Sequence, residues 1–200
     1  MLVVDALSHS FQRRTLFQGL SFTLKPGQLL RIQGANGVGK TTLLRLLAGL
    51  HQPKNGNIAM PNSWEYLPAE GNCLFGTLDA CANLRFWSKL RGVTLEEAEI
   101  RQALLSWKIP AALLDLQFPV GKMSTGMRRR IALCRLTLSK TRYWLLDEPT
   151  SGLDAQGQAA FLALVEDHLA HGGAAILVSH DEALSSALNP THLDLAHYAA

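Results

Sequence analysis

The hydrophobic residues of this sequence fall into short segments separated by polar turns and into longer amphipathic segments. Short runs of β-branched or alternating apolar residues predict strands at residues 2–4, 20–24, 29–33, 58–60, 65–67, 144–146 and 175–178. Residues 41–49 instead follow the 3.6-residue period of a helix. Because a strand, a glycine-rich turn and this helix follow one another, we predict an α/β fold with a parallel sheet.

Helical periodicity dominates between residues 77 and 139, where strand-like patterns are nearly absent. Pro110 and Pro119 divide this region, and Thr94 with Glu97 resembles a capping box at a helix start. Since the chain has no repeats or linker-like tracts, we predict a single domain over residues 1–200, with a helical insertion at about 72–140.

Composition and charge narrow the class of protein. Two hundred residues, 48% of them hydrophobic, suffice for one well-cored domain. The net charge of +3 comes from basic residues spread along the chain, with Arg128–Arg130 as the densest run, which argues against a nucleic-acid-binding surface. The three cysteines show no CxxC spacing, which argues against disulfides and a zinc site and favours a reducing compartment.

No apolar run approaches the roughly 20 residues of a membrane-spanning helix, and the N-terminus lacks the apolar region of a signal peptide. We therefore expect a soluble chain that stays in the compartment where it is made. His9, His51, His168 and His171 show no pocket-forming arrangement, and we expect them at the surface.

A phosphate-binding loop matches the pattern GxxxxGK[ST] and lies between the predicted strand 29–33 and the predicted helix. Glycines let its backbone N–H groups approach phosphate oxygens, and the helix N-terminus adds partial positive charge. Lys40 suits the β- and γ-phosphates, and the Thr41 hydroxyl suits Mg²⁺. The nucleotide-binding candidates are Gly34, Ala35, Asn36, Gly37, Val38, Gly39, Lys40, Thr41 and the adjoining Thr42.

Two adjacent carboxylates, Asp147 and Glu148, end the apolar segment that begins at Tyr143. Burying a carboxylate costs several kcal/mol unless it is paired or bound to metal. Two carboxylates at the end of a buried strand therefore indicate a functional role. Asp147 suits Mg²⁺ binding, and Glu148 suits polarising the water that attacks the γ-phosphate. A simple strand end at the surface is the alternative.

The run 147–154, Asp-Glu-Pro-Thr-Ser-Gly-Leu-Asp, resembles the Walker B and D-loop segment of the ATP-binding-cassette (ABC) family, and the resemblance extends over essentially the whole chain. It implies a P-loop NTPase with a mostly parallel core sheet, an N-terminal antiparallel β part and a helical insertion. It also implies an ATPase that uses ATP and Mg²⁺.

The segment 123–127, Met-Ser-Thr-Gly-Met, occupies the place of the family's LSGGQ signature. The resemblance implies that Ser124 and Gly126 contact the γ-phosphate bound by the opposite subunit. Thr125 and Met127 depart from the family pattern, which affects packing details rather than the phosphate contact. Arg129 or Arg130 could also reach ATP directly.

Two further positions match the family pattern, and each also has an alternative interpretation without a functional role. His180 lies two residues after the predicted strand 175–178 and matches the switch histidine that contacts the γ-phosphate and orients Glu148; a histidine at the end of a strand is otherwise a surface residue. Phe11 lies where the family places an aromatic residue that stacks on adenine, and a core Phe is the alternative because Phe17 and Phe22 are nearby.

The family's Q-loop glutamine has no counterpart, since residues 64–72 read Trp-Glu-Tyr-Leu-Pro-Ala-Glu-Gly-Asn. Glu70 could reach the metal as an oxygen ligand, although a carboxylate adds negative charge beside ATP. The departure indicates altered coupling or a water-mediated contact.

The resemblance also implies partners. One copy carries half of each catalytic site, which implies a head-to-tail homodimer with two ATP molecules at the interface. A transport role implies separate integral-membrane permease subunits, docked around residues 72–86 and holding this chain peripherally at the cytoplasmic face of the bacterial inner membrane. The substrate would be recognised by those subunits.

Among ABC subfamilies, residues 14–27, 34–50 and 83–86 resemble the ATPase subunit of the bacterial haem exporter of cytochrome c maturation. Another small ABC exporter, for a drug, lipid or ion, shares most of these residues. A soluble ABC protein of DNA repair or translation is disfavoured by the single cassette, and a module that binds without hydrolysing is disfavoured by Glu148.

Overall fold

The strands and helices divide between two compact units of the chain. The computed structural model describes residues 1–11, 14–181, 184 and 187–199. The first unit contains Met1–Tyr66, Thr141–Glu148 and Val165–Ala200, and the second contains Leu67–Lys140 and Pro149–Leu164. The chain therefore leaves the first unit and returns to it twice.

An antiparallel sheet in the first unit is formed by β1 (Leu2–Phe11), β2 (Arg14–Leu24) and β4 (Asn55–Ala59), in the order β2-β1-β4. Alternate residues of β1, among them Leu2 and Val4, turn into the core, as expected for a sheet with one buried face. The predicted N-terminal antiparallel part is confirmed, and its strands extend well beyond the short segments predicted from periodicity.

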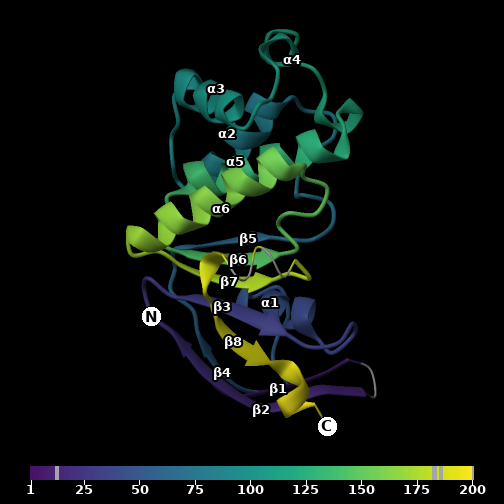
Figure 1. Cartoon of the computed structure of the whole chain (residues 1–200), viewed down its shortest axis with the longest axis vertical. Coiled ribbons are helices and arrows are strands. Elements are labelled where there is room, and N and C mark those ends of the chain that lie inside the picture. The colour runs from purple at the N-terminus through teal and green to yellow at the C-terminus, as the bar shows by residue number, and fades with distance from the viewer. Residues whose placement is uncertain (12–13, 182–183, 185–186, 200) are drawn as a thin grey trace. The chain divides into compact units, whose positions relative to one another are not determined.

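A second sheet has the order β5-β6-β7-β3-β8. Its strands are β3 (Leu29–Gln33), β5 (Trp64–Leu67), β6 (Tyr143–Asp147), β7 (Ala174–Val178) and β8 (Thr191–Asp194). β3 pairs in parallel with β7 and β8, and β6 pairs in parallel with β7 (Figure 1). β6 and β7 are buried at every residue, which explains their continuous apolar sequence. The predicted mostly parallel core sheet is confirmed.

Helix α1 (Lys40–Leu47) directly follows the phosphate-binding loop and packs into the core of the first unit. Leu43, Leu44, Leu46 and Leu47 are buried, and the helix contacts β6. This leucine face holds the N-terminus of α1 beside the parallel sheet. A short 3₁₀ helix, η2 (Leu195–Tyr198), follows β8.

The second unit is helical, as predicted. It contains α2 (Ala80–Leu90), α3 (Glu97–Ser106), α4 (Ala111–Asp115), the 3₁₀ helix η1 (Val120–Lys122), α5 (Thr125–Ser139) and the first part of α6 (Ala155–Ala170). α5 contacts α2 and α3, and α2 contacts α3 (Figure 1). Its core includes Ile100, Leu104, Ile131 and Leu133.

The predicted helix boundaries in this unit are partly right. Pro110 and Pro119 directly precede α4 and η1, so the predicted division is confirmed. The predicted capping box at Thr94 is wrong by two residues, because Glu96 caps α3 and its N–H donates to the Glu99 carboxylate at 2.9 Å.

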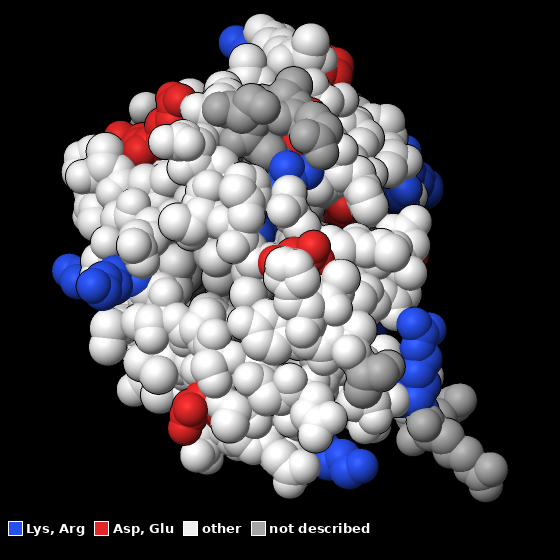
Figure 2. Space-filling view, turned by 60° about the horizontal axis from the view of Figure 1, so that its bottom comes forward, with Lys and Arg blue, Asp and Glu red and all other residues white. Residues whose placement is uncertain are grey.

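No helix in the described ranges is both long enough and apolar enough to cross a bilayer. The described basic side chains on the face shown in Figure 2 stand in separate groups.

His168 differs from the expected surface histidine, because its ring stacks on Trp144 with centroids 3.5 Å apart and planes 6° apart. Burial lowers the pKa of His168, which favours the neutral ring. The ring fits because residue 173 is glycine: a Cβ there would overlap it. Gly172, at φ +78°, ends α6, and the Gly173 N–H donates back to His168 O at 2.8 Å.

Gly173→Ala should destabilise the first unit by about 1–3 kcal/mol, because the added methyl displaces the His168 ring from Trp144. In a His168→Ala background, Gly173→Ala should lower the free energy of unfolding much less, because the ring that the methyl group would displace is absent. Gly172→Ala is the control, since its cost comes from φ and is independent of His168. Urea unfolding of Gly173→Ala and of Gly172→Ala, each in the wild-type and in the His168→Ala background, measures this, and an equal cost of Gly173→Ala in both backgrounds would contradict it.

Candidate functional site

The phosphate-binding loop adopts a conformation that requires glycine at three positions. Gly34, Gly37 and Gly39 have φ of 133°, 78° and 113°. A Cβ on Gly39 would lie 3.3 Å from side-chain atoms of Leu16 and Phe17, so the core also excludes a side chain there. The loop residues between these glycines are exposed or half-buried. The loop therefore presents its backbone to a ligand.

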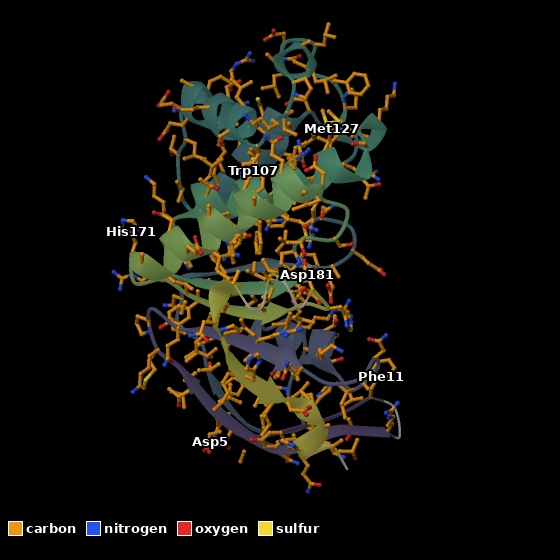
Figure 3. The ribbon with its side chains drawn as sticks, viewed as in Figure 1. Asp5, Phe11, Trp107, Met127, His171 and Asp181 are labelled. Atoms are coloured by element: carbon orange, nitrogen blue, oxygen red, sulfur yellow. The ribbon has the colours of Figure 1, made fainter. Side chains whose placement is uncertain are left out.

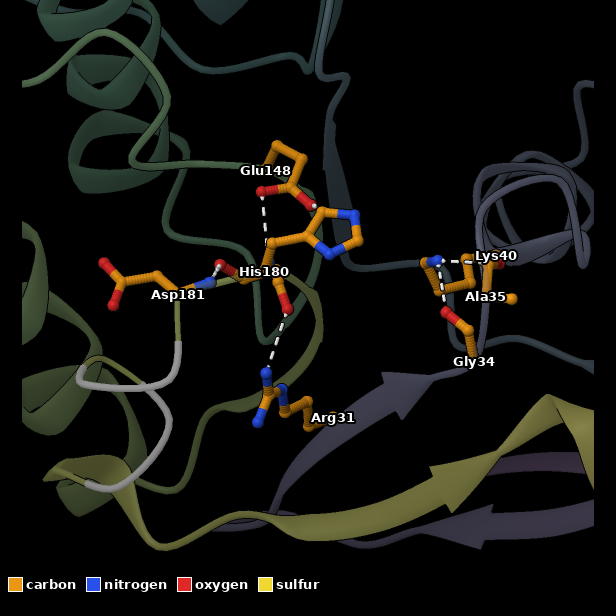
Figure 4. Close-up of polar contacts among 8 residues, drawn as sticks. Arg31, Gly34, Ala35, Lys40, Glu148, His180 and Asp181 are labelled. Atoms are coloured by element: carbon orange, nitrogen blue, oxygen red, sulfur yellow. Dashed lines mark hydrogen bonds and ion pairs between the residues drawn. The ribbon is translucent and has the colours of Figure 1, made fainter.

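Positive charge gathers where this loop meets α1. Lys40 Nζ donates to Gly34 O at 2.7 Å and to Ala35 O at 3.1 Å (Figure 4). The N-cap Gly39 offers no side chain to the first turn of α1, and that turn contains no acidic residue. Its backbone N–H groups and the ammonium group fit an anion such as a polyphosphate.

Glu148 follows β6 in an unusual backbone conformation. Its φ is 45°, in the left-handed region that non-glycine residues seldom adopt, and its N–H donates to Val178 O at 2.8 Å. Asp147, the last residue of β6, is only 2% exposed. A strained residue held by a hydrogen bond to the neighbouring strand is typical of a functional position.

The structure brings His180 to Glu148. The His180 ring nitrogen Nε2 lies 3.6 Å from Glu148 Oε1, and the His180 backbone N–H donates to Oε2 at 3.4 Å (Figure 4). The His180 side chain is 64% exposed, so it is a surface residue as well as a neighbour of Glu148. Parallel pairing places the ends of β3, β6 and β7 at one edge, where the phosphate-binding loop, Glu148 and His180 begin.

The oxygen donors near this edge fit Mg²⁺. In the described residues, no group of three or more His, Cys, Asp or Glu side chains forms a metal cluster. Mg²⁺ needs only one or two protein oxygens when phosphates and waters supply the rest. Thr41, in the first turn of α1, and Asp147, on β6, come from elements in contact and supply such oxygens.

Glu70 lies in the second unit, with an exposed side chain, and its proposed role at the metal stays a prediction. It lines a hollow of about 390 Å³ together with Asn72, Gly76, Gly121 and Arg128.

Phe11 ends β1 with 63% of its surface exposed (Figure 3). Phe17, by contrast, is fully buried, and Phe22 packs against the same core. The alternative of a core phenylalanine at position 11 is therefore wrong, and an exposed ring is available for stacking. Stacking on adenine stays a prediction.

Ser124 and Gly126 mark the start of α5. Ser124 is the N-cap, and its Oγ accepts the Met127 N–H at 3.2 Å while its hydroxyl hydrogen can donate elsewhere. A Cβ at Gly126 would come within 2.9 Å of Gly152 O, so this close approach requires glycine. The exposed start of α5 is a second helix N-terminus suited to phosphate.

Arg129 has a role that the sequence analysis missed. It is 2% exposed and donates to Pro149 O and Pro68 O at 2.8 Å, and to Asn72 Oδ1 at 2.9 Å. It thus joins α5 to the segment that replaces the Q-loop and to the residue after Glu148. The sequence does carry a signal for this burial. Arg129 lies three, four and seven residues before the apolar residues 132, 133 and 136, and this helical spacing places it on the buried face of α5.

Arg130 pairs with Asp154 through both carboxylate oxygens, at 2.7 and 2.8 Å. The Gly157 N–H and this guanidinium lower the pKa of Asp154. Both arginines are therefore engaged inside the second unit.

Arg129→Met should lower the free energy of unfolding by about 2–4 kcal/mol, because it leaves carbonyl oxygens that the guanidinium had satisfied. The adjacent Arg128→Met is the matched control and should cost less than about 0.5 kcal/mol, since the Arg128 side chain makes only a 3.5 Å bond to Thr125 Oγ1 among the side-chain hydrogen bonds described. Urea denaturation compares them, and equal losses would refute the role of Arg129.

The comparisons with known proteins agree with this geometry. The ABC transporter family model matches residues 17–151. A cytochrome c biogenesis ATP-binding export protein CcmA from Rhodobacter capsulatus is 40% identical over 202 residues, covering 100% of this chain and 89% of the relative. The protein of the same name from Methylococcus capsulatus is 41% identical over 182 residues, covering 84% of each chain.

Solved structures have the same fold. A putative ABC transporter ATP-binding protein from Pyrococcus furiosus has a TM-score of 0.82 at 26% identity, covering 100% of this chain and 99% of that one. A dimeric ATP-binding cassette bound to ADP and Pi has a TM-score of 0.81 at 16% identity, covering 94% and 91%. This chain belongs to the ABC transporter family and is an ATP-hydrolysing subunit of that family.

Proposed function

We propose that this ATPase drives haem export or handover for cytochrome c biogenesis, from the cytoplasmic face of a bacterial inner membrane. The observation that carries the ATPase role is the gathering of the phosphate-binding loop, Glu148 and His180 at one edge of the parallel sheet. The haem assignment is supported by relatives of about 40% identity that are named cytochrome c biogenesis ATP-binding export proteins.

The residues of the first unit divide the work of hydrolysis. The loop N–H groups and Lys40 bind the phosphates of ATP, and Phe11 stacks on the adenine. Thr41 and Asp147 are the residues that would hold Mg²⁺, and the ion would supply positive charge to neutralise the phosphates. The Glu148 carboxylate takes a proton from the attacking water, and His180 holds this carboxylate and the γ-phosphate in line.

A second copy of the chain completes each site. Lys40, Glu148 and His180 belong to the first unit, whereas Ser124 and Gly126 lie at the exposed start of α5 in the second. In a head-to-tail homodimer, Ser124 and the α5 N-terminus of one copy contact the γ-phosphate held by the other. ATP then joins the two copies, and hydrolysis releases them.

The integral-membrane permease subunits dock on the second unit in this proposal. The hollow lined by Glu70 and Gly76 is about 390 Å³ in volume. Phe75 and Phe86 are exposed and pack edge to face with ring centroids 4.8 Å apart. Exposed aromatic side chains are enriched at the centres of protein interfaces, which supports this place for the partner.

Mixing two defective variants tests the shared site. Lys40→Ala removes the ammonium group, and Ser124→Asp keeps a good N-cap but sets a carboxylate against the γ-phosphate. Each variant alone should be inactive. In a 1:1 mixture half of the dimers are mixed and contain one intact site, so about a quarter of wild-type ATPase activity should return. Mixed dimers without recovered activity would contradict the head-to-tail site.

Haem export is tested in a strain that lacks its own cytochrome c biogenesis ATP-binding export protein. This chain should restore haem-stained c-type cytochromes. Glu148→Gln should not, because losing the general base lowers kcat by about 100-fold or more while ATP binding persists. If the wild-type chain hydrolyses ATP but restores no c-type cytochrome, the assignment as an ATPase stands and the haem role is refuted. Another small exporter would then be favoured.

A further inference from the structure

Arg31 is a buried cation on β3, an interior strand of the parallel sheet. It lies on β3, three residues before Gly34, where the phosphate-binding loop begins, and it is 5% exposed. Its Nη2 donates to Ser179 O at 3.1 Å (Figure 4). The strand that supports the phosphate-binding loop is thereby bonded to the turn that follows β7.

The peptide group accepting this bond is the one that joins Ser179 to His180. Its carbonyl oxygen accepts from Arg31, and its N–H, on His180, donates to Glu148 Oε2 at 3.4 Å. The C=O and N–H of a trans peptide are coplanar and point in opposite directions, so fixing one fixes the other. Arg31 and Glu148 therefore hold the same peptide plane from its two sides.

The His180 ring depends on this backbone for its position. Its side chain is 64% exposed, so surrounding side chains hold it little, and its Nε2 still lies 3.6 Å from Glu148 Oε1. Within the turn, Ser179 Oγ accepts the Asp181 N–H at 3.1 Å. Rotating the 179–180 peptide would move both the ring and the N–H away from Glu148.

A guanidinium is a costly residue for this place. Taking a cation out of water has a large desolvation penalty, and a hydrophobic residue at this position of β3 would be buried without that penalty. A hydrogen bond from a charged donor is stronger than a neutral one and polarises the peptide that accepts it, which strengthens donation by its N–H. The charge thus favours the bond to the Glu148 carboxylate.

We propose that Arg31 is a positioning residue for ATP hydrolysis, which holds the 179–180 peptide so that His180 and Glu148 face each other. Arg31 acts through this turn, by its bond to Ser179 O. The inference rests on the roles of Glu148 and His180 given under the proposed function. It adds a link between the strand before the phosphate-binding loop and the residues that act on the γ-phosphate.

Steady-state ATPase kinetics of the full-length chain test the role. Arg31→Met should lower kcat by about 10-fold or more, because small displacements of catalytic groups are costly. KM for ATP should stay within about twofold, since the loop and Lys40 are intact. Arg31→Lys keeps the charge and should recover part of kcat. A raised KM with unchanged kcat would overturn the proposal.

A double-mutant cycle with His180→Ala separates positioning from general destabilisation. If Arg31 acts through the turn, the fold-losses of Arg31→Met and His180→Ala should combine to clearly less than their product. Arg135→Met is the matched control: Arg135 is also 5% exposed but stacks on Trp87 in the second unit, so its loss should multiply with that of His180→Ala.

The outcomes distinguish the two proposals. If His180→Ala leaves kcat unchanged, the proposed role of His180 is refuted. If His180→Ala lowers kcat and the Arg31→Met loss multiplies fully with it, the positioning role alone is refuted. Should Arg31→Met fail to fold, the same cycle with Arg31→Lys decides, because the shorter ammonium keeps the charge but changes the bond to Ser179 O.

Discussion

The parallel pairing of β3, β7 and β6 is the constraint on which the candidate site depends. Parallel strands end at the same edge, so the phosphate-binding loop, the carboxylates and His180 emerge together although they are distant in sequence. The apolar residues of β6 and β7 are buried throughout, which keeps both strands inside the sheet. A one-residue slip would move Asp147, Glu148 and His180 relative to one another and bury the wrong side chains.

Around this edge, polar contacts from three residues hold the backbone in place. Lys40 donates to two loop carbonyls, Glu148 donates its N–H to Val178 O, and Arg31 donates to Ser179 O. A fixed backbone sets the direction of each functional side chain before a ligand arrives, which reduces the cost of ordering the site. The strained φ of Glu148, which directly follows β6, is tolerated because its N–H is bonded to Val178 O on the neighbouring strand β7.

In the second unit, two arginine side chains hold neighbouring segments by hydrogen bonds. Arg129 bonds three segments from a single buried guanidinium, and Arg130 pairs with Asp154 at the start of α6. Together they fix the start of α5, where Ser124 and Gly126 lie, against the segment after Glu148. The segment that lacks the Q-loop glutamine is held through Pro68 and Asn72.

The sequence by itself determined the phosphate-binding loop, the strand and helix types and the family, because glycine conformation, helix period and motif spacing are local properties. It also showed Asp147 and Glu148 as adjacent carboxylates at the end of one strand and His180 near the end of another. Only the tertiary structure decided that His180 faces Glu148 and that Phe11 is exposed. It also decided that Glu96 rather than Thr94 begins the capping box, and that Arg31 reaches Ser179 across 148 positions. Such contacts depend on strand order and register, which local periodicity does not encode.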